Sequence, residues 1–101
     1  MQRQVEGALP EYRIFETDEF LRNLGKLSAK DRENIQGKLI DYAYPRLREQ
    51  PFFGPNIRKL RDYTPDTWRY RVGRYRVFCT MDEDDRTIYM LTVEARKDAY
   101  R

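Results

Sequence analysis

The sequence predicts an α+β fold: a short N-terminal strand, then two helices packed on one face of a small antiparallel sheet. Three observations predict it. The length of 101 residues suits one domain with one core. Apolar residues from Phe20 to about position 44 recur at helical spacing, and from Ile57 onward they alternate with the period of two that is typical of strands. Helices followed by a run of strands favour an α+β arrangement over a parallel α/β sheet.

The N-terminal boundary of the domain is predicted from a change in pattern. Residues 1–10 show no periodicity and end in proline, so we expect a flexible arm there. Residues 12–15 suit a short strand, with Tyr12 and Ile14 on one side. We therefore expect a single domain over residues 11–101.

A short first helix is predicted after this strand. Thr17 or Asp18 can act as its N-cap, and Phe20 begins an apolar stripe along one side. Gly25 can close the helix because glycine is common just beyond a helix C-terminus.

A second, longer helix is predicted to begin after Ser28. Ser28 and Asp31 resemble a capping box with aspartate in place of glutamate. Helical spacing continues to about Tyr44, where Pro45 disfavours helical geometry in the residue before it. Residues 45–56 are therefore expected to form an irregular connector.

The second half of the chain predicts an antiparallel meander. Residues 68–72 alternate apolar and basic side chains, and Gly73 permits a tight reversal into residues 74–81. Residues 82–86 form a polar hairpin turn before residues 87–93, which are rich in β-branched and aromatic types.

The alternation assigns side chains to the two faces of the sheet. If Trp68, Tyr70 and Val72 point toward the helices, Arg69 and Arg71 point away from them. One face of the sheet would then be left for solvent or a ligand.

Positive charge is concentrated in this part of the chain, although the formal net charge is only +3. Between positions 58 and 76 only Asp62 and Asp66 offset seven basic residues, Arg58, Lys59, Arg61, Arg69, Arg71, Arg74 and Arg76. Interleaved aromatic residues suit a polyanion with flat bases, such as RNA. A solvated sheet face is the alternative interpretation.

Composition excludes several chemistries. The chain has no histidine, so Ser-His and Cys-His catalysis and the common zinc sites are absent, and we expect neither a metal nor another cofactor. The single cysteine, Cys79, lies in an apolar run and is expected to be a buried structural thiol. With no signal-like N-terminus and no run of about 18 apolar residues, we expect a cytoplasmic protein with no membrane partner.

The C-terminal half resembles the RelE/ParE toxin superfamily. Residues 59–61 read K-L-R, and residues 68–78 read W-R-Y-R-V-G-R-Y-R-V-F, close to the family's loop and strand-turn-strand pattern. The match continues through the acidic hairpin and residues 88–93 into residues 96–101, which resemble the R-K-D/E-x-Y-R ending of the RelE-like branch. The resemblance implies the RelE-like microbial RNase fold, a cognate antitoxin partner and mRNA cleavage on the ribosome. Contact with DNA is expected only indirectly, through the antitoxin.

The resemblance also implies site residues. The catalytic positions carried over from RelE-like toxins are Arg69, Arg71, Arg76, Arg96 and Tyr100. Further RNA contacts are expected from Lys59, Arg61, Arg74, Tyr75 and Lys97. Metal-free RNA cleavage needs a base for the 2′-hydroxyl, an acid for the departing 5′-oxygen and cations for the charge at phosphorus. Arg76 and Arg96 suit the last task because guanidinium groups bind phosphate oxygens in pairs.

The chain departs from the best-known members at the two strand positions. These are often lysine there and are Arg69 and Arg71 here. Arginine holds its proton, with a pKa above about 12, so neither residue is an easy general base. Tyr100 is the better candidate because neighbouring arginines would stabilise its phenolate. The acid is left unassigned.

Three functions are consistent with the sequence. The first is a ribosome-dependent mRNA endoribonuclease that inhibits translation. The second is an inhibitor of DNA gyrase without nuclease activity, the function associated with the ParE branch of the same fold. The third is a generic RNA-binding module that does not arrest growth.

Overall fold

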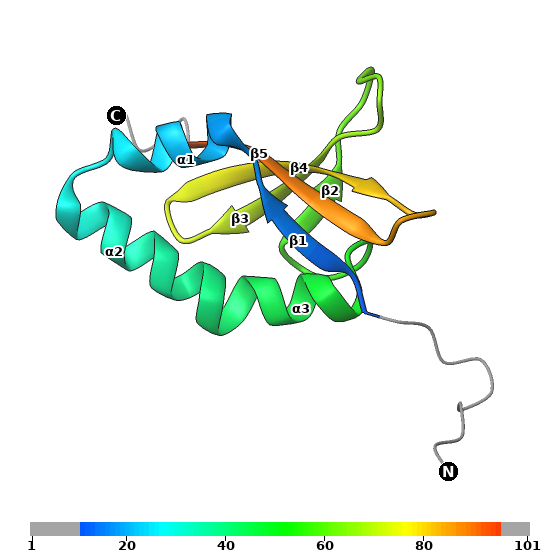
Figure 1. Ribbon diagram of the computed structural model, residues 1–101, viewed down its shortest axis with the longest axis horizontal. Coiled ribbons are helices and arrows are strands. Elements are labelled where there is room, and N and C mark those ends of the chain that lie inside the picture. The colour runs from blue at the N-terminus through cyan, green and yellow to red at the C-terminus, as the bar shows by residue number, and fades with distance from the viewer. Residues whose placement is uncertain (1–10, 96–101) are drawn as a thin grey trace, which may run out of the picture.

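A five-stranded mixed sheet forms the centre of the computed structural model, which describes residues 11–95 (Figure 1). The strands are β1 (Arg13–Glu16), β2 (Ile57–Lys59), β3 (Trp68–Val72), β4 (Tyr75–Asp82) and β5 (Thr87–Ala95). Their order across the sheet is β1-β5-β4-β3-β2. The predicted meander corresponds to β3, β4 and β5.

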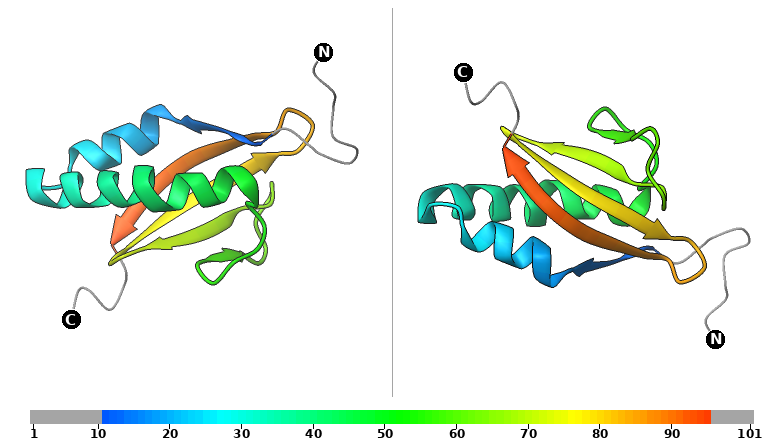
Figure 2. Two further views of the ribbon diagram at one scale, coloured as in Figure 1. Left: turned by 90° about the horizontal axis from the view of Figure 1, so that it is seen from below. Right: turned by 90° about the horizontal axis from the view of Figure 1, so that it is seen from above.

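The helices lie on one side of this sheet, as the two views of Figure 2 show. They are α1 (Asp18–Gly25), α2 (Ala29–Lys38), the π-helical segment η1 (Leu39–Ala43) and α3 (Tyr44–Glu49). The predicted α+β class and the two-layer arrangement are confirmed. None of the helices in the described part of the chain is long and apolar enough to span a membrane.

Two predicted N-caps are present. The side-chain oxygen of Thr17 accepts a hydrogen bond from the Phe20 backbone N–H at 3.2 Å, and that of Ser28 accepts one from the Asp31 N–H at 3.1 Å. Each cap satisfies a backbone donor that has no partner within its helix.

The predicted end of the second helix near Tyr44 is wrong, because helical structure continues through α3 to Glu49. The π-helical segment explains how the chain accommodates Pro45. Proline has no N–H and its ring clashes with the carbonyl four residues earlier in a regular α-helix. In the wider turn the Tyr44 N–H instead donates to the Leu39 carbonyl, and Pro45 enters at the start of α3, where a proline is tolerated.

The sheet differs from the expected antiparallel one at β1. β1 pairs in parallel with β5, while β2-β3, β3-β4 and β4-β5 pair antiparallel. Thr17 links the end of β1 to β5 and to α1. Its hydroxyl donates a 2.7 Å hydrogen bond to the Met90 carbonyl of β5 and also caps α1. A connection through helices is long enough to return the chain to a parallel neighbour, which a tight hairpin cannot do.

The core lies between the sheet and the helices. The buried apolar side chains include Phe20, Leu24, Ile35, Leu39 and Leu47 from the helices, and Tyr70, Val72, Val77, Cys79, Ile88 and Met90 from the strands. Cys79 is fully buried, as predicted, and burial raises the pKa of its thiol to about 12. The opposite face of the sheet is not covered by these helices, and we call it the open face.

Candidate functional site

Strand pairing collects four arginines on the open face. In the register of the sheet Arg71 lies opposite Arg76, and Arg58 lies opposite Arg69. Side chains of residues paired across strands point to the same side. Tyr70 and Val72 point into the core, so these arginines point away from it. We call Arg58, Arg69, Arg71 and Arg76 the arginine cluster.

Arg69 lies close enough to the other three arginines to be affected by their charges. Its pKa is lowered first by partial burial and then by the positive charges of Arg58, Arg76 and Arg71. Crowded cations favour an anion between them, since the anion relieves this repulsion. The arginine cluster therefore has the charge and the donors that a phosphate group could use.

Arg76 has the least exposed side chain among the described ion-pairing residues, at 21% relative accessibility. Its Nη2 lies 3.6 Å from Oε1 of Glu94 on β5, which is longer than a good hydrogen bond. Its Nε is buried and finds no hydrogen-bond partner among residues 11–95. A buried donor of this kind is costly unless something satisfies it.

The structure brings together three of the five expected catalytic residues, Arg69, Arg71 and Arg76. The other two, Arg96 and Tyr100, lie outside the described residues, as does Lys97. The catalytic role of the three stays a prediction.

The expected RNA contacts Lys59 and Arg61 lie near the edge strand β2. Lys59 pairs with Trp68, so it is on the other side of the strand from Arg58, and its Nζ contacts Asp66 at 3.2 Å. Arg61 is exposed in the loop between β2 and β3, which rises on the side of the sheet away from α2 and α3 (Figure 1). Arg61 can therefore extend the basic surface, whereas Lys59 is already paired.

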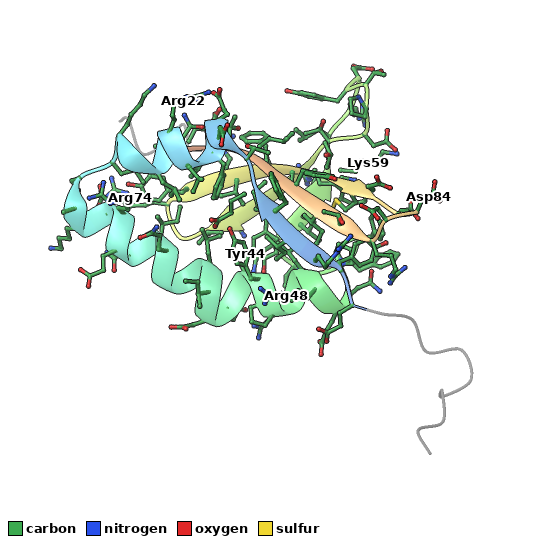
Figure 3. All side chains as sticks on the ribbon, in the orientation of Figure 1. Arg22, Tyr44, Arg48, Lys59, Arg74 and Asp84 are labelled. Atoms are coloured by element: carbon green, nitrogen blue, oxygen red, sulfur yellow. The ribbon has the colours of Figure 1, made fainter. Side chains whose placement is uncertain are left out.

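Arg74 and Tyr75 lie at the turn between β3 and β4. Tyr75 is buried, and its hydroxyl is hydrogen-bonded to Asp31 of α2, so its ring is on the helix side and not beside the arginine cluster. Arg74 is exposed and borders, with Lys30 and Lys38, a pocket of about 230 Å³ between α2 and this turn. Figure 3 shows Arg74 beside α2, at the opposite end of β3 from Lys59.

Sequence reasoning missed two residues of this face. Arg58 was recognised as part of the basic segment but not placed in the site, because the register of the three-residue strand β2 cannot be read from alternation. Glu94 lies just beyond the predicted strand of residues 87–93, whereas in the structure it is the penultimate residue of β5 and lies opposite Arg76. The alternation of residues 87–93, extended by one residue, is the signal that could have found it.

Chemically, the arginine cluster can hold a phosphodiester and neutralise charge that accumulates on it. Permanently protonated guanidinium groups cannot readily accept a proton. One layer of helices covers one face of the sheet and cations stand on the other, so the open face has the charge that a polyanion or an acidic protein segment would complement.

Comparison with known families identifies the class of domain. The family model described as the ParE toxin of type II toxin-antitoxin system, parDE, matches residues 14–100. The chain belongs to this family, and so to the RelE/ParE toxins of type II toxin-antitoxin systems. No curated protein matches the sequence significantly.

Solved structures share the fold. A chain of the RelBE2 toxin-antitoxin complex of Mycobacterium tuberculosis is similar with a TM-score of 0.68 and 24% identity, over 85% of this chain and 99% of that one. The isolated E. coli RelE toxin gives a TM-score of 0.61 and 22% identity, over 88% and 90% of the two chains. A chain of the RelE-RelB complex of Pyrococcus horikoshii gives 0.58 and 22%, over 86% and 97%.

Proposed function

We propose that this toxin is an endoribonuclease that cleaves mRNA on the ribosome without a metal and thereby inhibits translation. The observation that carries the proposal is the arginine cluster on the open face, where three residues expected from the RelE-like pattern stand together with Arg58. An RNA strand offers such a surface a phosphate at every nucleotide.

The cluster performs the electrostatic part of the reaction. The 2′-hydroxyl of one nucleotide attacks the adjacent phosphorus, and negative charge accumulates on the phosphate oxygens. Arg76 binds these oxygens together with Arg96 of the C-terminal segment, because guanidinium groups can hold phosphate oxygens in pairs. Arg69 and Arg71 hold the flanking backbone, and Tyr100 takes part in proton transfer.

The proposed partners are mRNA, the ribosome and a cognate antitoxin. RelB-type proteins accompany the RelE chains in the complexes from M. tuberculosis and P. horikoshii. For this chain we propose an acidic antitoxin segment that covers the open face, because the arginine cluster offers it complementary charge. Bound there, it would block access of RNA to the cluster.

The test is a purified translation reaction in which the ends of the mRNA are mapped by primer extension. Wild type is expected to cut the mRNA only when ribosomes are present, and Tyr100→Phe to cut far more slowly with unchanged folding. Intact mRNA on actively translating ribosomes would exclude the nuclease function.

Inhibition of DNA gyrase is the second candidate, and one finding favours it: the matching family model is that of the ParE toxins. The arginines at positions 69 and 71, in place of lysines, agree with a binding function that needs no base. A supercoiling assay separates the candidates. Inhibition of gyrase by wild type, Arg76→Ala and Tyr100→Phe alike would favour this second function, and no inhibition would favour the first.

A further inference from the structure

We propose that Glu94 is the general base of the cleavage reaction, the group that takes the proton from the attacking 2′-hydroxyl. This inference rests on the proposed nuclease function. The reaction needs a proton acceptor besides the arginine cluster, because arginines can hold phosphate but do not accept protons.

The position of Glu94 follows from the strand register. Arg71 on β3, Arg76 on β4 and Glu94 on β5 form one row across the open face. The carboxylate oxygen Oε1 lies 3.6 Å from Nη2 of Arg76. A carboxylate thus stands at the end of the row that would bind the phosphate.

The ion pair is loose enough to leave both groups available. At 3.6 Å the two side chains attract each other without a good hydrogen bond, and Glu94 remains 54% exposed. The Nε of Arg76 has no partner in the described part of the chain. The terminal nitrogens of the part-exposed Arg76 side chain can bind a phosphate oxygen while Glu94 keeps a free lone pair toward solvent.

The distances suit proton transfer from the 2′-hydroxyl. In a near-attack arrangement the 2′-oxygen lies about 3 Å from phosphorus. A phosphate held by Arg76 places this oxygen within a few ångströms of the Arg76 side chain, the same range in which Glu94 is found. The base must lie within about 3 Å of the hydroxyl, which a small rotation of the exposed Glu94 side chain allows.

The 2′-O–H proton moves to the Glu94 carboxylate, and the 2′-oxygen forms a bond to phosphorus. The bond from phosphorus to the 5′-oxygen breaks, and that oxygen takes the phenolic proton of Tyr100. The products are a 2′,3′-cyclic phosphate and a 5′-hydroxyl. In this scheme Tyr100, which the sequence suggested as the base, takes the role of the acid.

The decisive variant is Glu94→Gln, which keeps the shape of the side chain and removes the base. It also removes a negative charge beside the phosphate, so the two possible roles of Glu94 predict opposite results. As a base, its loss lowers the single-turnover cleavage rate by about 100-fold or more while RNA-ribosome binding stays at least as tight. As a mere counter-ion of Arg76, its loss would leave cleavage unchanged or faster.

Two further variants complete the experiment. Glu94→Ala is expected to regain part of its cleavage rate when formate or acetate is added, because a small carboxylate can occupy the vacated space. Glu83→Gln, in the exposed hairpin turn, removes the same charge away from the cluster and is expected to cleave like wild type.

The results separate failure of this inference from failure of the nuclease function. Wild-type activity together with a fully active Glu94→Gln overturns the base assignment alone. Absence of rescue by formate in an inactive, folded Glu94→Ala also contradicts it. No cleavage by wild type overturns both proposals.

Discussion

The hydroxyl of Tyr44 donates a 2.6 Å hydrogen bond to Oε2 of Glu16 and so ties the first residue of α3 to the last residue of β1. Figure 3 shows Tyr44 directed from the helix toward the sheet. Among residues 11–95 β1 has one strand neighbour, β5, so this bond adds an attachment to α3 at the edge of the sheet.

Tyr44→Phe is expected to lower the free energy of unfolding by about 1–2 kcal/mol. The substitution removes the bond and leaves the Glu16 carboxylate without this donor, while the ring still fills its buried space. Urea unfolding followed by circular dichroism measures the change. Equal stability of the variant and wild type would show that the bond contributes nothing net.

Alkaline pH is expected to destabilise the protein through two buried groups. Burial, and then the bond to Glu16, raise the pKa of Tyr44 well above its ordinary value, and burial raises that of Cys79 to about 12. Both pKa values are raised in the folded state. The stabilisation from the two neutral groups is therefore complete below the unfolded pKa values, about 8.5 for cysteine and 10 for tyrosine, and is lost as the pH rises from these toward the folded values. Urea midpoints should therefore fall between about pH 8.5 and 11, and less steeply in Tyr44→Phe.

Two glycines are expected to respond oppositely to alanine. Gly73 in the β3-β4 turn has φ +59°, and an added Cβ would lie 2.9 Å from the movable Nζ of Lys38, so Gly73→Ala should cost about 1–2 kcal/mol. Gly37 lies within α2, with nothing within 4 Å of an added Cβ, so Gly37→Ala should stabilise by about 0.5–1 kcal/mol. Thermal unfolding of the two variants provides the comparison. Equal shifts would contradict the turn geometry.

Arg58→Ala and Arg69→Ala are expected to weaken binding to a single-stranded RNA oligonucleotide and to reduce its salt dependence. Each lost phosphate contact should lower the slope of log affinity against log salt by about 0.7. Arg48→Ala is the matched control, since Arg48 lies on α3 beside Tyr44, on the helix side of the molecule (Figure 3). Fluorescence anisotropy at several salt concentrations measures all three. An equal loss in the control would mean that net charge, and not the arginine cluster, governs binding.

The sequence predicted those features that depend on local periodicity. Alternation along residues 68–72 placed Arg69 and Arg71 away from the helices, because the period of two holds for any strand. Arg58 and Glu94 were missed because their place depends on which residues of β2 and β5 pair with their neighbours, and this register is set by tertiary packing.

Tertiary structure also explains the extended helix. Pro45 locally disfavours helix, but Tyr44 and Leu47 on either side of it are buried in the core. The free energy gained by burying these two side chains offsets the cost of one π-helical turn. A prediction from the residues next to Pro45 alone does not include this tertiary burial. The parallel pairing of β1 is likewise a non-local choice, because β1 and β5 are separated by most of the domain.

The central claim is that the arginine cluster binds the RNA phosphate at which cleavage occurs. Its most direct test is single-turnover cleavage of ribosome-bound mRNA by wild type and Arg76→Ala, with equal folding checked by circular dichroism. Loss of one preorganised cation should slow cleavage by about 100-fold or more. Cleavage by Arg76→Ala at the wild-type rate and at the same positions would contradict the claim.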